Sequence, residues 1–139
     1  MVKFLAGLSV ILVAIAIQSF LASVGIYLNL ALAALIALAL IFDFWELLFA
    51  DLLAVFVMNW QPAPSLTLIV FFLIPVAVFF SKHVFRWQLW IHALIAVFFG
   101  FVLFYIVASP ETVLSNLKHG LLDIFAGALL AEFVIFSLR

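Results

Sequence analysis

Three carboxylates, Asp51, Asp123 and Glu132, fall inside long apolar runs, where they could do chemistry. The chain has only six acidic residues among 139. Ionisable groups inside a hydrophobic span are costly, and they often belong to proton or ion pathways. One hypothesis is therefore an intramembrane polar site centred on Asp51, with Gln18 or His92 on another span as its partner.

Each of these carboxylates also has a purely structural interpretation. Asp123 lies in the first turns of the last apolar run, where it would be close to the membrane interface. Glu132 and Arg139 are seven residues apart and share a helical face, so both could extend toward the surface. Asp123 and Glu132 are nine residues apart, about half a turn out of phase, and are not expected to pair. Both interpretations stay open.

Other chemistries lack their residue patterns. The three histidines, His83, His92 and His119, have no ligand spacing, and the chain has no cysteine, so we expect no metal site. No nucleophile elbow or phosphate-binding loop is present, and we expect neither a cofactor nor an enzyme. A net charge of −1 without a basic cluster argues against nucleic-acid binding.

The composition is that of a membrane protein. Hydrophobic residues make up 72% of the chain and charged residues 8%, against about 25% charged in soluble domains. The apolar runs are long and unbroken, unlike the alternating segments of about 10 residues in a membrane barrel. We therefore predict a single all-α domain over residues 1–139, in contact with the lipid bilayer. The first run, which continues to Leu28, is expected to be a retained span.

The apolar runs predict about six spans separated by polar segments. Residues 59–65 are expected to form a loop with two prolines, residues 81–88 a polar loop, and residues 109–120 a connector. The spans are expected at about 4–28, 30–42, 43–58, 66–80, 89–108 and 121–138.

The segment 30–58 has two possible structures. It could be one helix of 29 residues, about 43 Å long, or two helices that break at Asp43. Asp43 and Glu46 have the spacing of a capping box, in which each side chain satisfies a backbone N–H of the other. Trp45 beside them suits the membrane interface. These features favour two helices.

The positions of the cations also favour two helices over residues 30–58. With six spans, Lys3, Lys82, Arg86 and Arg139 all fall on one side of the membrane, whereas one long helix would separate Lys3 from Lys82. Cytoplasmic loops carry an excess of Lys and Arg. We therefore expect both termini to be cytoplasmic.

Small residues spaced four apart indicate faces where helices could pack closely, within the chain or against a partner. Three apolar runs carry such pairs: Ser19 and Ser23, Ala33 and Ala37, and Gly127 and Ala131.

The arrangement resembles that of the bacterial rod-shape-determining MreD family. The similarity lies in "LNLALAALIALALIF" (28–42), "ELLFADLLAVF" (46–56), a proline-containing outer loop and "FFSKHVFR" (79–86). Leu48 and Asp51 would match a Leu-Leu-x-Asp-like element of that family. The resemblance implies a multi-pass subunit of the bacterial plasma membrane without catalytic activity. It would scaffold cell-wall elongation together with MreC, peptidoglycan synthases and the MreB cytoskeleton.

The resemblance also supplies an alternative, because the MreD fold is similar to that of energy-coupling-factor S components. These proteins bind vitamins for transport. A carrier of this kind predicts a polar cavity that opens to the outer side, to which Asn29, Gln61 and Ser65 could contribute.

Overall fold

The chain forms a bundle of helices connected by short segments. The computed structural model describes residues 1–26, 28–58, 66–108 and 117–138, so the whole predicted loop 59–65 and residues 109–116 of the predicted connector lie outside the described residues. The described helices are α1 (Val2–Ser23), α2 (Leu30–Ile41), α3 (Phe44–Met58), α4 (Leu66–Val84), α5 (Leu89–Ala108) and α7 (Leu117–Leu138).

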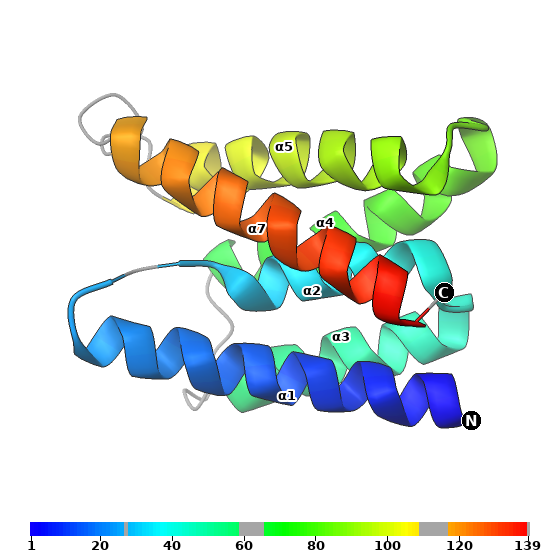
Figure 1. The fold of residues 1–139 in the computed structure, drawn as a ribbon, viewed down its shortest axis with the longest axis horizontal. Coiled ribbons are helices and arrows are strands. Elements are labelled where there is room, and N and C mark those ends of the chain that lie inside the picture. Colours follow the sequence, from blue (N-terminus) through cyan, green and yellow to red (C-terminus); the bar gives the residue numbers. More distant parts are fainter. Residues whose placement is uncertain (27, 59–65, 109–116, 139) are drawn as a thin grey trace.

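Successive helices run in opposite directions along the bundle (Figure 1). Both termini lie at one end, on the right in Figure 1, together with the α2–α3 turn and the α4–α5 connection. This end carries Lys3, Lys82 and Arg86. The α1–α2 connection lies at the opposite end.

Four of the helices, α1, α4, α5 and α7, are long and apolar enough to cross a membrane. The prediction of a helical membrane protein is confirmed at this level. The helices α2 and α3 have 12 and 15 residues, or about 18 Å and 22 Å at 1.5 Å per residue. Both are shorter than a hydrocarbon core of about 30 Å. Whether these two also cross, as six spans require, stays a prediction.

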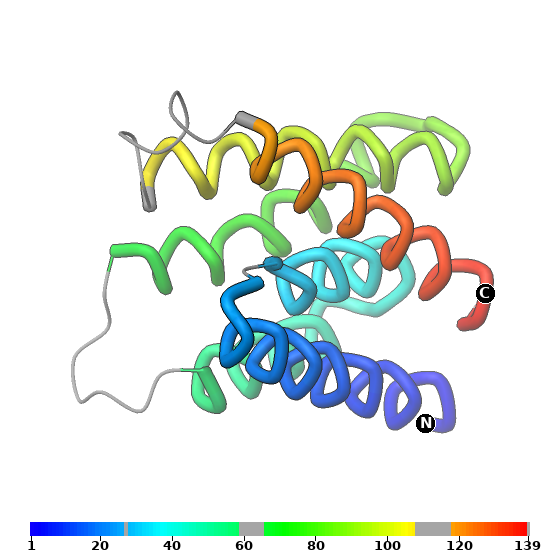
Figure 2. The backbone as a smooth tube through the Cα atoms, turned by 60° about the vertical axis from the view of Figure 1, so that its left-hand side comes forward, coloured from blue at the N-terminus to red at the C-terminus, as the bar shows by residue number. Residues whose placement is uncertain are grey.

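The short helix α2 occupies the centre of the bundle. Every residue from Ala31 to Leu40 is buried, and α2 contacts α1, α3, α4, α5 and α7. A helix that is apolar on all sides is stable only when it is surrounded. Figure 2 shows the cyan turns of α2 enclosed by the other helices. Its alternating Ala and Leu side chains supply a thin, apolar helix around which the longer helices pack.

The outer faces of the bundle are also apolar. Large exposed side chains such as Phe20 on α1, Phe56 on α3 and Phe133 on α7 project away from the core. A soluble monomer rarely exposes so much contiguous apolar surface. The hydrocarbon of a bilayer is the medium that suits this surface.

The break between α2 and α3 falls at the predicted acidic residues. The backbone N–H of Asp43 donates to Oε2 of Glu46 at 3.3 Å, and the N–H of Leu47 donates to the carbonyl of Asp43 at 2.9 Å. This is the Glu46 half of the predicted capping box. Residues 30–58 therefore form two helices, not one long helix.

Candidate functional site

The amino end of α2 is closed by side chains from other helices. The first N–H groups of a helix have no partner within it, and Asn29, the N-cap residue, makes no side-chain capping bond. The N–H of Ala31 donates to Oε1 of Gln18 on α1 at 3.0 Å. The N–H of Asn29 donates to Oδ1 of Asp123 on α7 at 2.8 Å.

The carboxyl end of α2 is closed by a cation from α4. Nζ of Lys82 donates a hydrogen bond of 2.9 Å to the carbonyl oxygen of Phe42, the C-cap residue. The same ammonium group lies 4.2 Å from the centre of the Phe79 ring, where the negative face of the ring attracts it. Lys82 therefore holds the end of α2 and packs over an aromatic ring at the same time.

The charges at the two ends complement the helix dipole. Asp123 lies at the positive amino end of α2, and Lys82 at the negative carboxyl end. We call Gln18, Asp123 and Lys82 the α2 clamp. It supplies bonds that a 12-residue helix inside a bilayer cannot obtain from water.

The sequence does not reveal what the clamp residues bind. Asp123, which we expect near the membrane interface, has a fully buried side chain at the amino end of α2. Gln18 was considered as a partner for Asp51, and Lys82 as a loop cation. The one available signal was a polar residue inside or beside an apolar run, which does not reveal the partner.

Asp51 is buried in the middle of α3. Its side chain is 0% exposed, and neither carboxylate oxygen has a hydrogen-bond partner among the described residues. Gln18 bonds to Ala31, and His92 to Ser81, so neither residue pairs with Asp51. An uncompensated buried carboxylate is expensive. The described surroundings of Asp51 thus give no structural reason for a carboxyl group at this position.

Glu132 lies on α7 two turns or more from Asp123, about 13 Å along the helix axis. The structure does not bring the two carboxylates together. Oε1 of Glu132 is buried without a partner among the described residues. Arg139, with which Glu132 shares a predicted face, lies outside the described residues.

The predicted small-residue pairs occupy two environments. Ala33 and Ala37 on α2 and Ala131 on α7 are fully buried. A methyl group built at Gly127 would lie 3.3 Å from Cβ of Ala33, so α2 and α7 approach closely there. Ser19 and Ser23 are exposed on α1, and the Ser23 hydroxyl donates to the carbonyl of Phe20 within the same helix.

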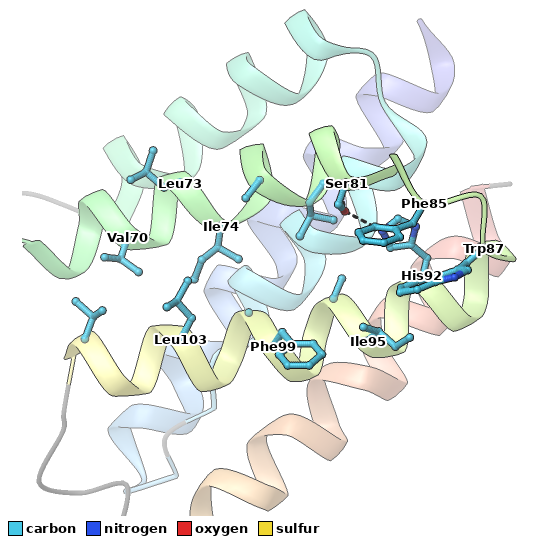
Figure 3. Close-up of a pocket in the computed structure, with 15 residues that line it drawn as sticks. Val70, Leu73, Ile74, Ser81, Phe85, Trp87, His92, Ile95, Phe99 and Leu103 are labelled. Atoms are coloured by element: carbon cyan, nitrogen blue, oxygen red, sulfur yellow. Dashed lines mark hydrogen bonds between the residues drawn. The ribbon is translucent and has the colours of Figure 1, made fainter. Parts of the chain in front are cut away.

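A lateral cavity of about 500 Å³ lies between α4 and α5. Figure 3 shows Ile74 of α4 and Leu103 of α5 pointing toward one another across it. At one end, Oγ of Ser81 and Nε2 of His92 lie 2.8 Å apart in a hydrogen bond. The remaining lining is almost wholly apolar, and sequence reasoning did not anticipate this cavity.

The described residues hold no group of three or more His, Asp or Glu side chains that could bind a metal ion. No protein family, curated protein or solved structure matches the chain.

Proposed function

We propose that the protein is a non-catalytic integral membrane subunit that binds another membrane protein through the outer faces of its helices. Its role would be that of the MreD proteins that the sequence resembles. It would lie in the bacterial plasma membrane and scaffold the machinery of cell-wall elongation. The expected partner is a protein with its own span, similar to MreC.

The observation that carries this proposal is the position of α2. A carrier keeps a polar cavity between its spans, but here the centre of the bundle is filled by an apolar helix. The half-buried Gln18 and the buried Asp123 accept hydrogen bonds from the backbone at the amino end of α2. One oxygen of each side chain is thus used in holding the fold, whereas Oδ2 of Asp123 is buried without a partner among the described residues.

The vitamin-carrier alternative has little support from the described residues. Asn29 is buried with its N–H bonded to Asp123, and its Oδ1 atom is also buried. Gln61 and Ser65, the other residues considered for such a site, lie outside the described residues. The cavity between α4 and α5 is apolar, which does not suit a polar vitamin.

The charge distribution supports an orientation. Lys3, Lys82 and Arg86 belong to the end of the bundle that also holds both termini. By the positive-inside rule, this end would face the cytoplasm. A partner that connects to cytoskeletal and wall-synthesis proteins could then be engaged within the membrane.

A candidate surface for the partner is the exposed side of α1. Of the four helices of spanning length, α1 has the smallest buried share. Ser19 and Ser23 form a small-residue pair on this exposed surface, where another helix could approach closely.

The test is native mass spectrometry of the tagged protein, released with its lipids from the membranes of its own source. We expect a bound protein that contains a transmembrane span. The double variant S19L/S23L should lose this partner, whereas S9L, a matched change at an exposed serine of α1, should keep it. Recovery of the wild-type protein with a polar small molecule and no protein partner would overturn the proposal in favour of the carrier.

A further inference from the structure

The cavity between α4 and α5 has the form of an open groove. Its floor is made of buried residues with small or compact side chains, among them Ile74, Ala96 and Gly100. Its rim is made of exposed apolar side chains, including Leu73 and Phe99. Because the rim is exposed on the outer face of the bundle, the groove opens sideways into the hydrocarbon of the bilayer.

The groove is about as long as one leaflet of a bilayer. On α4 it extends from Val70 to Ser81, about 16 Å, and on α5 from His92 to Val107, about 22 Å, at 1.5 Å per residue. Half of a hydrocarbon core of about 30 Å is about 15 Å. The groove is therefore long enough on both helices to hold one lipid chain over the depth of a leaflet.

The polar end of the groove is formed by the half-buried Ser81 and the buried His92. His92 is only 4% exposed, and Oγ of Ser81 lies 2.7 Å from the carbonyl of Val78 and 2.8 Å from Nε2 of His92. The Ser81 hydroxyl donates its proton either to the carbonyl of Val78 or to Nε2 of His92. In both cases Nε2 is hydrogen-bonded to Ser81. Nδ1 has no hydrogen bond to a described residue, so it can bind a polar group of a ligand in the groove.

Aromatic rings and a cation lie at the same end. The rings of Phe85 and Trp87 stack at 4.6 Å, and Trp87 meets the His92 ring edge-on at 5.7 Å. Figure 3 shows Phe85, Trp87 and His92 gathered at the end of the groove. Arg86 is exposed between these two aromatic residues in the chain and forms no ion pair with a described residue. Such a belt is typical of the membrane interface, where lipid headgroups lie.

We propose that this groove binds one acyl chain of an anionic phospholipid. The chain lies along the floor between α4 and α5, the glycerol region meets Ser81 and His92, and the phosphate lies beside Arg86. A positive charge near the interface attracts anionic lipids. A helix segment about 10 Å wide with its side chains and about 16 Å long occupies about 1,200 Å³, more than a cavity of about 500 Å³ can hold.

This inference is independent of the proposed scaffold function, because it requires no protein partner. The test uses the purified, delipidated full chain in detergent. Palmitoyl-oleoyl phosphatidylglycerol or palmitoyl-oleoyl phosphatidylcholine, which carry the same chains, is added in steps. Native mass spectrometry then counts the bound lipids. We expect one molecule of phosphatidylglycerol to bind at a lower lipid concentration than phosphatidylcholine needs.

A first pair of variants tests the groove. Ala77 is an exposed groove residue on α4, so A77F fills the groove without entering the core. Its affinity for phosphatidylglycerol should fall by about tenfold, because burial of several methylene groups is lost. The control, A16F, places the same side chain at an exposed alanine of α1 and should bind as wild type does.

A second pair tests the headgroup end. R86Q should bind phosphatidylglycerol about fivefold more weakly and phosphatidylcholine unchanged, since only the charge interaction is removed. K3Q removes another exposed cation from the same end of the bundle and should have no effect. If A77F and A16F bind phosphatidylglycerol with equal affinity, the proposal that the lipid lies in the groove is wrong. Equal phosphatidylglycerol binding by R86Q and K3Q would overturn the choice of an anionic lipid.

Discussion

Nζ of Lys82 lies 2.9 Å from the carbonyl oxygen of Phe42, so a cation on α4 closes the carboxyl end of α2. At the other end of α2, Asp123 accepts from the N–H of Asn29 at 2.8 Å. A short helix in the centre of a membrane bundle thus has an anion at its amino end and a cation at its carboxyl end. This arrangement explains how a helix too short to reach water at both ends can be stable.

Replacement of Lys82 should weaken the carboxyl end of α2. K82M keeps an apolar stem but removes the bond to Phe42 and the charge at the helix end, so it should cost about 1–2 kcal/mol. The measurement is thermal unfolding in detergent, followed by circular dichroism. K3M, a change at an exposed cation, is the control and should leave the Tm unchanged. Equal Tm values for the two variants would show that the clamp bond contributes nothing.

Two variants of Asp123 separate hydrogen bonding from charge. D123N keeps an oxygen that can accept from the N–H of Asn29, whereas D123L leaves that buried donor without a partner. An unsatisfied buried donor costs about 1–3 kcal/mol, so D123L should have the lower Tm. Amide hydrogen exchange at Asn29 should be faster in D123L than in D123N. Equal Tm values for D123N and D123L, both below that of the wild type, would mean that the carboxylate acts there through its charge alone.

Two glycines of α7 should respond oppositely to alanine. A methyl group at Gly127 would lie 2.8 Å from Cζ of Phe101, a buried ring, whereas one at Gly120 meets nothing within 4 Å. Overpacking of a core costs about 1–3 kcal/mol, so G127A should lower the Tm. G120A should leave the Tm unchanged or raise it, because alanine favours a helix by up to about 1 kcal/mol. Equal effects would contradict the close α5–α7 packing.

Local signals in the sequence predicted more of the fold than of the site. The α2–α3 break could be predicted because Asp43 and Glu46 are three residues apart and interact directly. The clamp could not, because its bonds join residues 13, 94 and 40 positions apart on three different helices. Helices in a membrane protein are apolar on the faces that contact lipid and on those that contact protein. Their sequence therefore does not reveal which apolar run lies at the centre of the bundle. The shortness of the run 30–42 was the only sign.

The number of spans can be measured with single cysteines, because the chain has none of its own. Lys3, Val24 and Asp43 are exposed positions at the two ends of α1 and beyond α2. If α1 and α2 both cross, K3C and D43C should react with an impermeant maleimide from the same side of the membrane, and V24C from the other side. Labelling of D43C from the V24C side would mean that α2 does not cross, which would reduce the number of spans below six.

Asp51 should be dispensable for stability. Its carboxylate is fully buried and has no hydrogen-bond partner among the described residues, so removing it should relieve a cost. Replacement of unpaired buried polar groups by apolar ones of similar size is often neutral or stabilising. D51V should therefore keep or raise the Tm, with D51N as the isosteric comparison. If a scaffold role is correct, both variants should also retain the membrane partner in native mass spectrometry. A variant that is more stable but has lost its partner would instead identify Asp51 as a residue kept for function at a cost in stability.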